Sequence, residues 1–206
     1  MRETTAVRTM KDITPGRRRR GSRLGAAAFA ASLAVAGGAL AAPSSQAAPT
    51  ASSGVTACNT NWGSLAKSKA NTSSSQVRRV RAGQHTCFDR MVIDLRGTVR
   101  GYDVRYAPVY TEGQGKRVWL KGGADLRVIV RSPAYNSRGQ ATYTPRSRTN
   151  AVDVTGFRTF RQIAYGGSFE GQTTFGVGTR ARLPMRVFVL KRDGGSRLVI
   201  DVAHRW

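Results

Sequence analysis

From residue 86 onward, apolar and polar residues alternate along the chain in short runs separated by turn residues. In the first run, Met91, Ile93 and Leu95 fall on one side, and Arg90 and Asp94 fall on the other. A period of two residues is typical of a β-strand that buries one face and exposes the other to water. We therefore predict a half-buried strand in this run.

The same alternation, interrupted by glycine-rich turns, predicts further strands. They lie at 101–110, 117–123, 125–132, 157–165, 168–178, 183–192 and 197–206. The last two are joined by "DGGS" (193–196), a hairpin signal, whereas the polar stretch 133–150 is expected to be a long exposed loop. About eight short strands without a convincing helix favour a sandwich or a barrel, and we predict an all-β, two-sheet β-sandwich.

Two six-residue segments near the ends of this region are almost identical. "RMVIDL" spans 90–95, and "RLVIDV" spans 197–202. Each places three apolar residues on one side and an arginine and an aspartate on the other. We predict that the two segments are equivalent strands of one sheet, where they can be neighbours. Asp94 and Asp201 are then interpreted as surface residues that pair with nearby arginines, and not as a catalytic carboxylate pair.

Residues 1–47 have the three parts of a secretory signal peptide. An arginine block (17–23) precedes an alanine-rich apolar stretch (24–42), and small residues lead to a cleavage site between Ala47 and Ala48. The apolar stretch is close to the length of about 20 residues that spans a membrane, so a retained anchor is the alternative. Cleavage would leave a secreted protein with no stable membrane span.

Residues 48–84 are polar and poor in apolar side chains, which predicts a flexible lead-in to a domain at 85–206. A short helical turn near 64–69 is the longest regular structure expected within it. The chain has two cysteines, Cys58 in the lead-in and Cys87 at the start of the domain. An even number of cysteines in an exported protein predicts a disulfide.

Two other uses of the cysteines are open. "VTAC", which ends at Cys58, formally resembles a lipobox, although it lies well beyond the apolar stretch. Cys87 is a candidate nucleophile that His85 or His204 would assist. A second cysteine that can pair with it favours the disulfide over both.

The chain contains 34 Lys and Arg against 11 Asp and Glu, a formal net charge of +23 at pH 7. Such a charge attracts polyanions, among them nucleic acids, anionic lipids and the phosphate polymers of a cell wall. A proteome biased toward arginine would produce the same excess without a ligand. Specific nucleic-acid binding is not expected, because no aromatic-rich platform is recognisable. No metal-binding spacing of His and Cys and no phosphate-binding glycine loop is present, so no cofactor is predicted.

The polar run "SFEGQTTFGVGTRAR" (168–182) contains the candidate ligand contacts. Carboxylate, amide, hydroxyl and guanidinium groups on one sheet face suit a carbohydrate or a peptide. The candidates are Glu170, Gln172, Thr174, Arg180 and Arg182. An ordinary exposed sheet face is the alternative interpretation. The three tryptophans would either stack on a sugar or pack against other side chains.

Four segments together resemble the AMIN-like domain of exported actinobacterial proteins. They are "HTCFDRMVIDLRG", "GYDVRY", "RQIAYGGSFEGQTTFGVGTRARLPMRVFVL" and "RLVIDVAH", and the resemblance covers 85–206. Such domains are similar to the AMIN modules beside cell-wall amidases and secretins, which are β-sandwiches that recruit their carriers to peptidoglycan and lack catalytic activity. The resemblance implies a secreted, non-catalytic module that binds or localises to the envelope through wall glycan, peptide or an anionic wall polymer. It assigns no individual residue.

Two alternatives come from other classes of function. A wall-acting hydrolase would use Glu170 as its acid, and its absence would show as unchanged wall-digestion products. A charge-driven binder would take nucleic acid, and equal binding to DNA and to unrelated polyanions would identify it.

Overall fold

The computed structural model describes residues 58–72 and 75–206, which belong to one compact unit. The predicted signal peptide, its cleavage site between Ala47 and Ala48, and the lead-in up to residue 57 lie outside the described residues. The described part contains eleven strands and no helix. The strands are β1 (Lys67–Ala70), β2 (Gln76–Gln84), β3 (Phe88–Arg96), β4 (Gly101–Tyr106), β5 (Val109–Tyr110), β6 (Arg117–Val118), β7 (Ala124–Val130), β8 (Phe160–Phe169), β9 (Gln172–Thr179), β10 (Met185–Arg192) and β11 (Gly195–Ala203).

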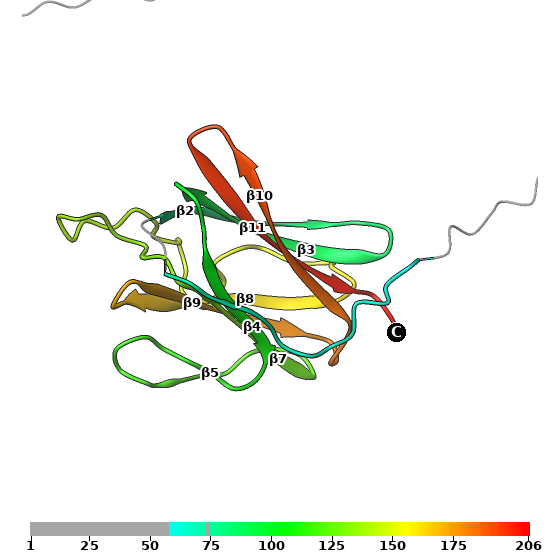
Figure 1. Ribbon diagram of the computed structural model, residues 1–206. Helices are drawn as coiled ribbons and strands as arrows, with labels where there is room; N and C mark the ends of the chain where they lie inside the picture. The colour runs from blue at the N-terminus through cyan, green and yellow to red at the C-terminus, as the bar shows by residue number, and fades with distance from the viewer. Residues whose placement is uncertain (1–57, 73–74) are drawn as a thin grey trace, which may run out of the picture. The chain divides into compact units, whose positions relative to one another are not determined.

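Nine of these strands form two antiparallel sheets that make the layers of a sandwich (Figure 1). The five-stranded sheet has the order β1-β4-β7-β9-β8, and the four-stranded sheet has the order β10-β11-β3-β2. The remaining two strands, β5 and β6, pair with each other. The prediction of an all-β, two-sheet sandwich is confirmed, as is the hairpin between β10 and β11.

The core lies between the two main sheets and is built from alternate residues of each strand. Its fully buried side chains include Met91, Ile93, Leu198 and Ile200 from one sheet and Leu126, Val128, Phe175 and Val177 from the other. Removing such apolar surface from water is the dominant favourable term in folding. This arrangement explains the period of two in the sequence, because only one side of each of these strands faces the core.

The repeated hexapeptide forms the central pair of the four-stranded sheet, β3 and β11. The register places Arg90 opposite Asp201 and Arg197 opposite Asp94. Because the two copies run antiparallel, the arginine of each copy meets the aspartate of the other. The prediction that the copies lie in one sheet is confirmed, and so is the pairing with arginine. The expectation of a surface position is wrong for Asp201, which is 0 % exposed because two guanidinium groups cover it.

Residues 76–84, which the sequence assigned to the polar lead-in, form β2 at the edge of the four-stranded sheet. A bulge between Val77 and Arg79 inserts an extra residue, so the alternation of apolar residues is interrupted. The inward residues of this strand are therefore hard to recognise as a period of two. The structure places the start of the sandwich before residue 85.

The helical turn expected near 64–69 does not form, and that expectation is wrong. Lys67 instead begins β1, a four-residue strand that pairs with β4 along the edge of the five-stranded sheet. Pairing supplies backbone hydrogen bonds from a partner strand, whereas a single helical turn is costly to nucleate. A short polar segment beside an open sheet edge therefore becomes a strand.

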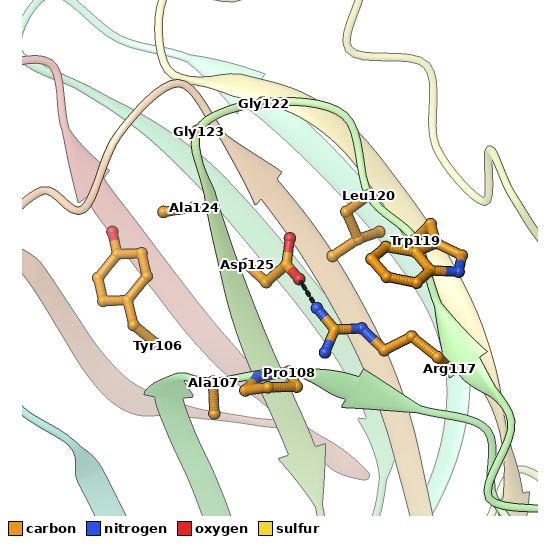
Figure 2. Close-up of a pocket in the computed structure, with 10 residues that line it drawn as sticks. All are labelled: Tyr106, Ala107, Pro108, Arg117, Trp119, Leu120, Gly122, Gly123, Ala124 and Asp125. Carbon is orange, nitrogen blue, oxygen red and sulfur yellow. Dashed lines mark hydrogen bonds and ion pairs between the residues drawn. The ribbon is translucent and has the colours of Figure 1, made fainter.

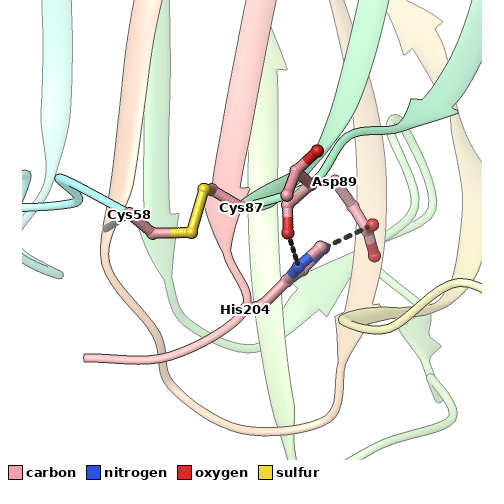
Figure 3. The surroundings of a disulfide bond; sticks show 5 residues. Cys58, Cys87, Asp89 and His204 are labelled. Carbon is pink, nitrogen blue, oxygen red and sulfur yellow. Dashed lines mark hydrogen bonds and ion pairs between the residues drawn. A yellow bond between two sulfur atoms is a disulfide. The ribbon is translucent and has the colours of Figure 1, made fainter. Parts of the chain in front are cut away.

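The predicted disulfide joins Cys58 to Cys87 (Figure 3). It fastens the segment before β1 to the start of β3. Closing a loop of 29 sequence positions stabilises the fold by about 3.5 kcal/mol in the chain-entropy model. Beside it, His204 Nε2 lies 2.9 Å from Asp89 Oδ1, and Asp89 also accepts a hydrogen bond of 2.6 Å from the backbone N–H of Thr159. These contacts hold the end of β11 and the start of β8 against β3.

The segment that carries β5 and β6 lies over the outer face of the five-stranded sheet, where β9 presents glycines. A Cβ atom at Gly178 would lie 2.0 Å from the carbonyl oxygen of Lys121, and one at Gly176 would lie 2.9 Å from Leu120 Cδ1. Only glycine permits so close an approach. Val109 of β5 is fully buried as a result. Thus β9 is covered on both faces, and the covering segment forms one wall of a pocket.

Candidate functional site

A pocket of about 400 Å³ opens between the end of β4, the β6 region and the start of β7. Its lining is formed by Tyr106, Ala107, Pro108, Arg117, Trp119, Leu120, Gly122, Gly123, Ala124 and Asp125. Figure 2 shows Tyr106 on one side and Trp119 with Leu120 on the other, with Arg117 and Asp125 pointing toward each other between them. We call this site the Trp119 pocket.

An ion pair lies inside the Trp119 pocket. Arg117 Nη2 donates a hydrogen bond of 2.7 Å to Asp125 Oδ2. The guanidinium carbon of Arg117 also lies 4.9 Å from the centre of the Trp119 ring, a cation–π distance. Within the described residues, the Nε atom of Arg117 is buried and has no hydrogen-bond partner. The pair therefore presents an oriented carboxylate and a guanidinium group, although the unpartnered Nε of Arg117 is itself buried.

Trp119 supplies the apolar surface of the pocket. Its side chain is 80 % exposed, and Tyr110 on the neighbouring strand is 46 % exposed. An exposed indole beside oriented polar groups suits a ligand with an apolar face and hydroxyl or amide groups at its edge. A pyranose ring and a short peptide both have this character.

The opposite wall is fixed by hydrogen bonds to the backbone. The Tyr106 hydroxyl donates to the carbonyl oxygen of Leu183 and accepts from its N–H, both at 3.0 Å. Burial of the Tyr106 hydroxyl raises its pKa, so this wall stays neutral at physiological pH. The guanidinium group of Arg182 lies 5.6 Å from the Tyr106 ring centre. Arg182, one of the predicted ligand contacts, is therefore a neighbour of the pocket.

The glycine turn before β7 closes the pocket at one end. Gly123 donates a hydrogen bond of 2.8 Å to the carbonyl oxygen of Thr179. A Cβ atom at Gly123 would lie 2.5 Å from the carbonyl oxygen of Arg180, and Gly122 has a φ of +118°. The turn is thus pressed against the end of β9, next to Arg180, a second predicted contact.

The other three predicted contacts lie toward the opposite end of β9. Glu170 occupies the two-residue turn between β8 and β9 with a φ of 46°, and Gly171 follows it with a φ of 77°. Positive φ at both positions is the conformation that a tight hairpin requires. The amide of Gln172 donates to the Glu112 carboxylate at 3.1 Å, and the hydroxyl of Thr174 also donates to it.

The five candidates are therefore not one cluster. Thr174 is only 2 % exposed, because the segment carrying Glu112 covers it. Arg180 donates a hydrogen bond to the carbonyl oxygen of His204, and Arg182 Nε donates one of 3.2 Å to Ser64 Oγ. Their roles as ligand contacts stay a prediction.

Sequence reasoning did not select Arg117 and Asp125, and it treated Trp119 only as one of three tryptophans. The available signal was an aromatic residue in "RVWLKGG", a short strand that ends in two glycines. The pairing of Arg117 with Asp125 depends on how β6 lies beside β7, which no local pattern reveals.

In the part of the chain that the structure describes, no group of three or more His, Cys, Asp or Glu side chains is placed to hold a metal ion. No helix among the same residues is long and apolar enough to cross a membrane.

Comparison with known proteins identifies a family. A family model described as the AMIN-like domain matches residues 75–204, which includes β2 and all later strands. No curated protein and no solved structure matches the chain.

Proposed function

Because this chain belongs to the AMIN-like domain family, we propose that it is a secreted, non-catalytic module that binds peptidoglycan through the Trp119 pocket. The family supports association with cell-wall components and a location outside the cytoplasmic membrane. The N-terminal segment supports export, since residues 1–47 have the pattern of a signal peptide. The ligand would be wall glycan or its peptide.

The observation that carries the proposal is the combination of Trp119 with the Arg117–Asp125 pair. The exposed indole offers a stacking surface for the apolar face of a sugar ring. Arg117 and Asp125 offer donors and acceptors at a fixed distance for hydroxyl, amide or carboxylate groups. Glycan and peptide stems of peptidoglycan contain all of these groups.

The hydrolase alternative finds less support. Asp125 is bound by the guanidinium group of Arg117, and no second carboxylate among the described residues lines the pocket to complete the acid pair that glycoside hydrolysis uses. Glu170 lies on a tight turn and not beside the pocket. We therefore expect incubation with peptidoglycan to leave the glycan and peptide products unchanged.

Co-sedimentation with purified peptidoglycan, stripped of its anionic polymers, tests the proposal. We expect the full-length protein to sediment with it and Trp119→Ala to bind about tenfold more weakly, because removing one stacking ring costs on the order of 1 kcal/mol or more. Trp206→Ala is the matched control, since Trp206 is 72 % exposed but does not line the pocket.

Equal weakening in the two tryptophan variants, or no sedimentation of the wild type at low ionic strength, would contradict the proposal. Glu170→Ala and Arg180→Ala, compared in the same assay, test the contacts predicted from the sequence. Weaker binding of Glu170→Ala would place the ligand at the β8–β9 turn instead.

A further inference from the structure

A second surface, on the other side of the sandwich, has a different chemistry. Cross-strand partners share a face of a sheet, so the register of the four-stranded sheet defines what its outer face presents. Going from β10 to β2, the successive rows are Arg186–Asp201–Arg90–Gly83, Phe188–Val199–Val92–Arg81, Leu190–Arg197–Asp94–Arg79 and Arg192–Gly195–Arg96–Gln76. These rows contain seven arginines and two aspartates, and we call this surface the arginine face.

The two aspartates hold their arginines in a common way. Asp94 accepts from Arg81 Nε at 2.9 Å and from Arg197 Nε at 3.1 Å. Asp201 accepts from Nε of Arg90 at 2.6 Å. Arg186 likewise donates to Asp201 through Nε, at 2.8 Å. Arg81 and Arg90 also donate through Nη2, at 3.3 and 2.9 Å, so their Nη1 groups remain for an external anion. Arg186 and Arg197 are attached to the aspartates through Nε, which leaves both of their Nη groups.

Aromatic rings support the same arginines. The guanidinium carbon of Arg186 lies 4.4 Å from the Trp62 ring centre and 5.4 Å from that of Phe88. The guanidinium carbon of Arg90 lies 5.1 Å from the ring centre of Phe88 and 5.6 Å from that of Phe188. Stacking on rings restricts the long side chains, so less conformational entropy is lost when they bind an anion. The arginine face is thus preorganised as well as positive.

A hollow of about 220 Å³ lies on this face. Val92 and Val199 contribute to its floor, and both are nearly fully buried. The guanidinium-bearing side chains of Arg81, Arg90 and Arg197 contribute to its walls. A phosphate group in this hollow would meet several donors, and Arg is the residue that best matches the geometry of phosphate oxygens.

From these observations we infer that the arginine face binds a base-free phosphodiester polymer of the poly(glycerol phosphate) type. Repeated anions match rows of arginines that recur across four neighbouring strands. A nucleic acid fits less well, because binding of single strands relies on rings that are free to stack on bases. On this face the rings of Trp62, Phe88 and Phe188 are already engaged by guanidinium groups. The inference adds a second ligand and does not rest on the Trp119 pocket.

The test measures binding of fluorescently labelled poly(glycerol phosphate) to the full-length protein over a range of salt concentrations. The variant pair Arg81→Gln with Arg197→Gln removes two walls of the hollow and leaves Asp94 near Arg192. The matched control is Arg138→Gln with Arg146→Gln, which removes the same charge from exposed positions in the 133–150 loop.

We expect the first pair to lower the affinity at least tenfold at low salt. We also expect it to reduce the slope of log affinity against log salt by about 1.4, because each phosphate that a protein neutralises on a single-stranded polymer adds roughly 0.7 to that slope. The control pair should change the affinity less than threefold. If the double variant does not fold, the single variants Arg81→Gln and Arg197→Gln are measured instead. Each should reduce the slope by about half as much as the pair.

Equal weakening in the two variant pairs would show attraction by net charge alone and would overturn the inference. Single-stranded DNA of matched charge should bind more weakly, and equal or tighter binding of DNA would overturn the assignment to a base-free polymer. Trp119→Ala should bind poly(glycerol phosphate) as the wild type does. Failure of the pocket and failure of the arginine face are therefore distinguishable.

Discussion

At the scale of single residues, the carboxylates of Asp94 and Asp201 tie together neighbouring strands of the four-stranded sheet. Asp201 has no exposed surface and is held by Arg90 and Arg186, which come from the two strands beside its own. A buried charge is costly unless it is paired and hydrogen-bonded. Removing either arginine should therefore lower the free energy of unfolding strongly. Asp94 is arranged in the same way with Arg81 and Arg197, but it is less deeply buried.

The pH dependence of stability should reflect Asp94. Burial opposes its ionisation, but the guanidinium groups of Arg81 and Arg197 outweigh burial and hold the pKa of Asp94 below its ordinary value. A lowered folded-state pKa contributes stability that is complete above the unfolded value of about 3.9. That contribution is lost as the pH falls through the folded-state pKa.

We therefore expect Asp94→Asn to be less stable than the wild type at about pH 6 and to approach it at about pH 3. Urea unfolding at both pH values measures the difference in free energy of unfolding. A difference that stays constant between them would show that the Asp94 charge does not contribute through its arginine partners.

The strand β9 is more deeply buried than its sequence suggests. Its sequence "QTTFGVGT" combines polar residues with glycines and predicted an exposed ligand face. In the structure, Thr173 to Thr179 are all buried, because the core covers one side and the β5–β6 segment covers the other. Gly176 and Gly178 of β9 lie where the β5–β6 segment packs closely against the strand. Glycines within a strand often mark such a close approach of another backbone.

Gly178 should be essential for this arrangement. A methyl group there would lie 2.0 Å from the carbonyl oxygen of Lys121, so the β5–β6 segment or β9 must shift. We expect Gly178→Ala to lower the free energy of unfolding by about 2–3 kcal/mol, as overpacking does. The same displacement should weaken peptidoglycan binding, because Trp119 and Leu120 precede Lys121.

Gly83→Ala is the control for this prediction. Gly83 is also a strand glycine, but a Cβ atom there meets nothing within 4 Å. Its free energy of unfolding should change by less than about 1 kcal/mol, because no atom must move. Equal urea midpoints for the two variants would contradict the close packing at Gly178.

Strands that bury one face in the core and have regular alternation were predictable from the sequence. β3 and β11 have regular alternation, and the turn at Asp193 marks the hairpin before β11. β2 was not predictable in the same way, because its bulge interrupts the period. The pocket was not predictable either, since Arg117 meets Asp125 only after β5, β6 and the glycine turn have folded over the sheet.

At the scale of the whole domain, the two layers of the sandwich present different chemistry. The outer side of the five-stranded sheet carries the Trp119 pocket, with an indole and one ion pair. The outer side of the four-stranded sheet carries seven arginines against two aspartates. A module with these two faces would contact glycan with one and a phosphate polymer with the other. The arginine face holds five net positive charges of the formal +23 that the whole chain carries.

The most direct test of peptidoglycan binding at the Trp119 pocket is the NMR signal of the tryptophan indole N–H groups during titration with soluble peptidoglycan fragments. The chain has three tryptophans, so each indole signal can be assigned by single substitution. We predict that the Trp119 signal shifts and saturates with fragment concentration, while the signals of Trp62 and Trp206 stay in place. A Trp119 signal that does not move while either of the others shifts would contradict the proposed site.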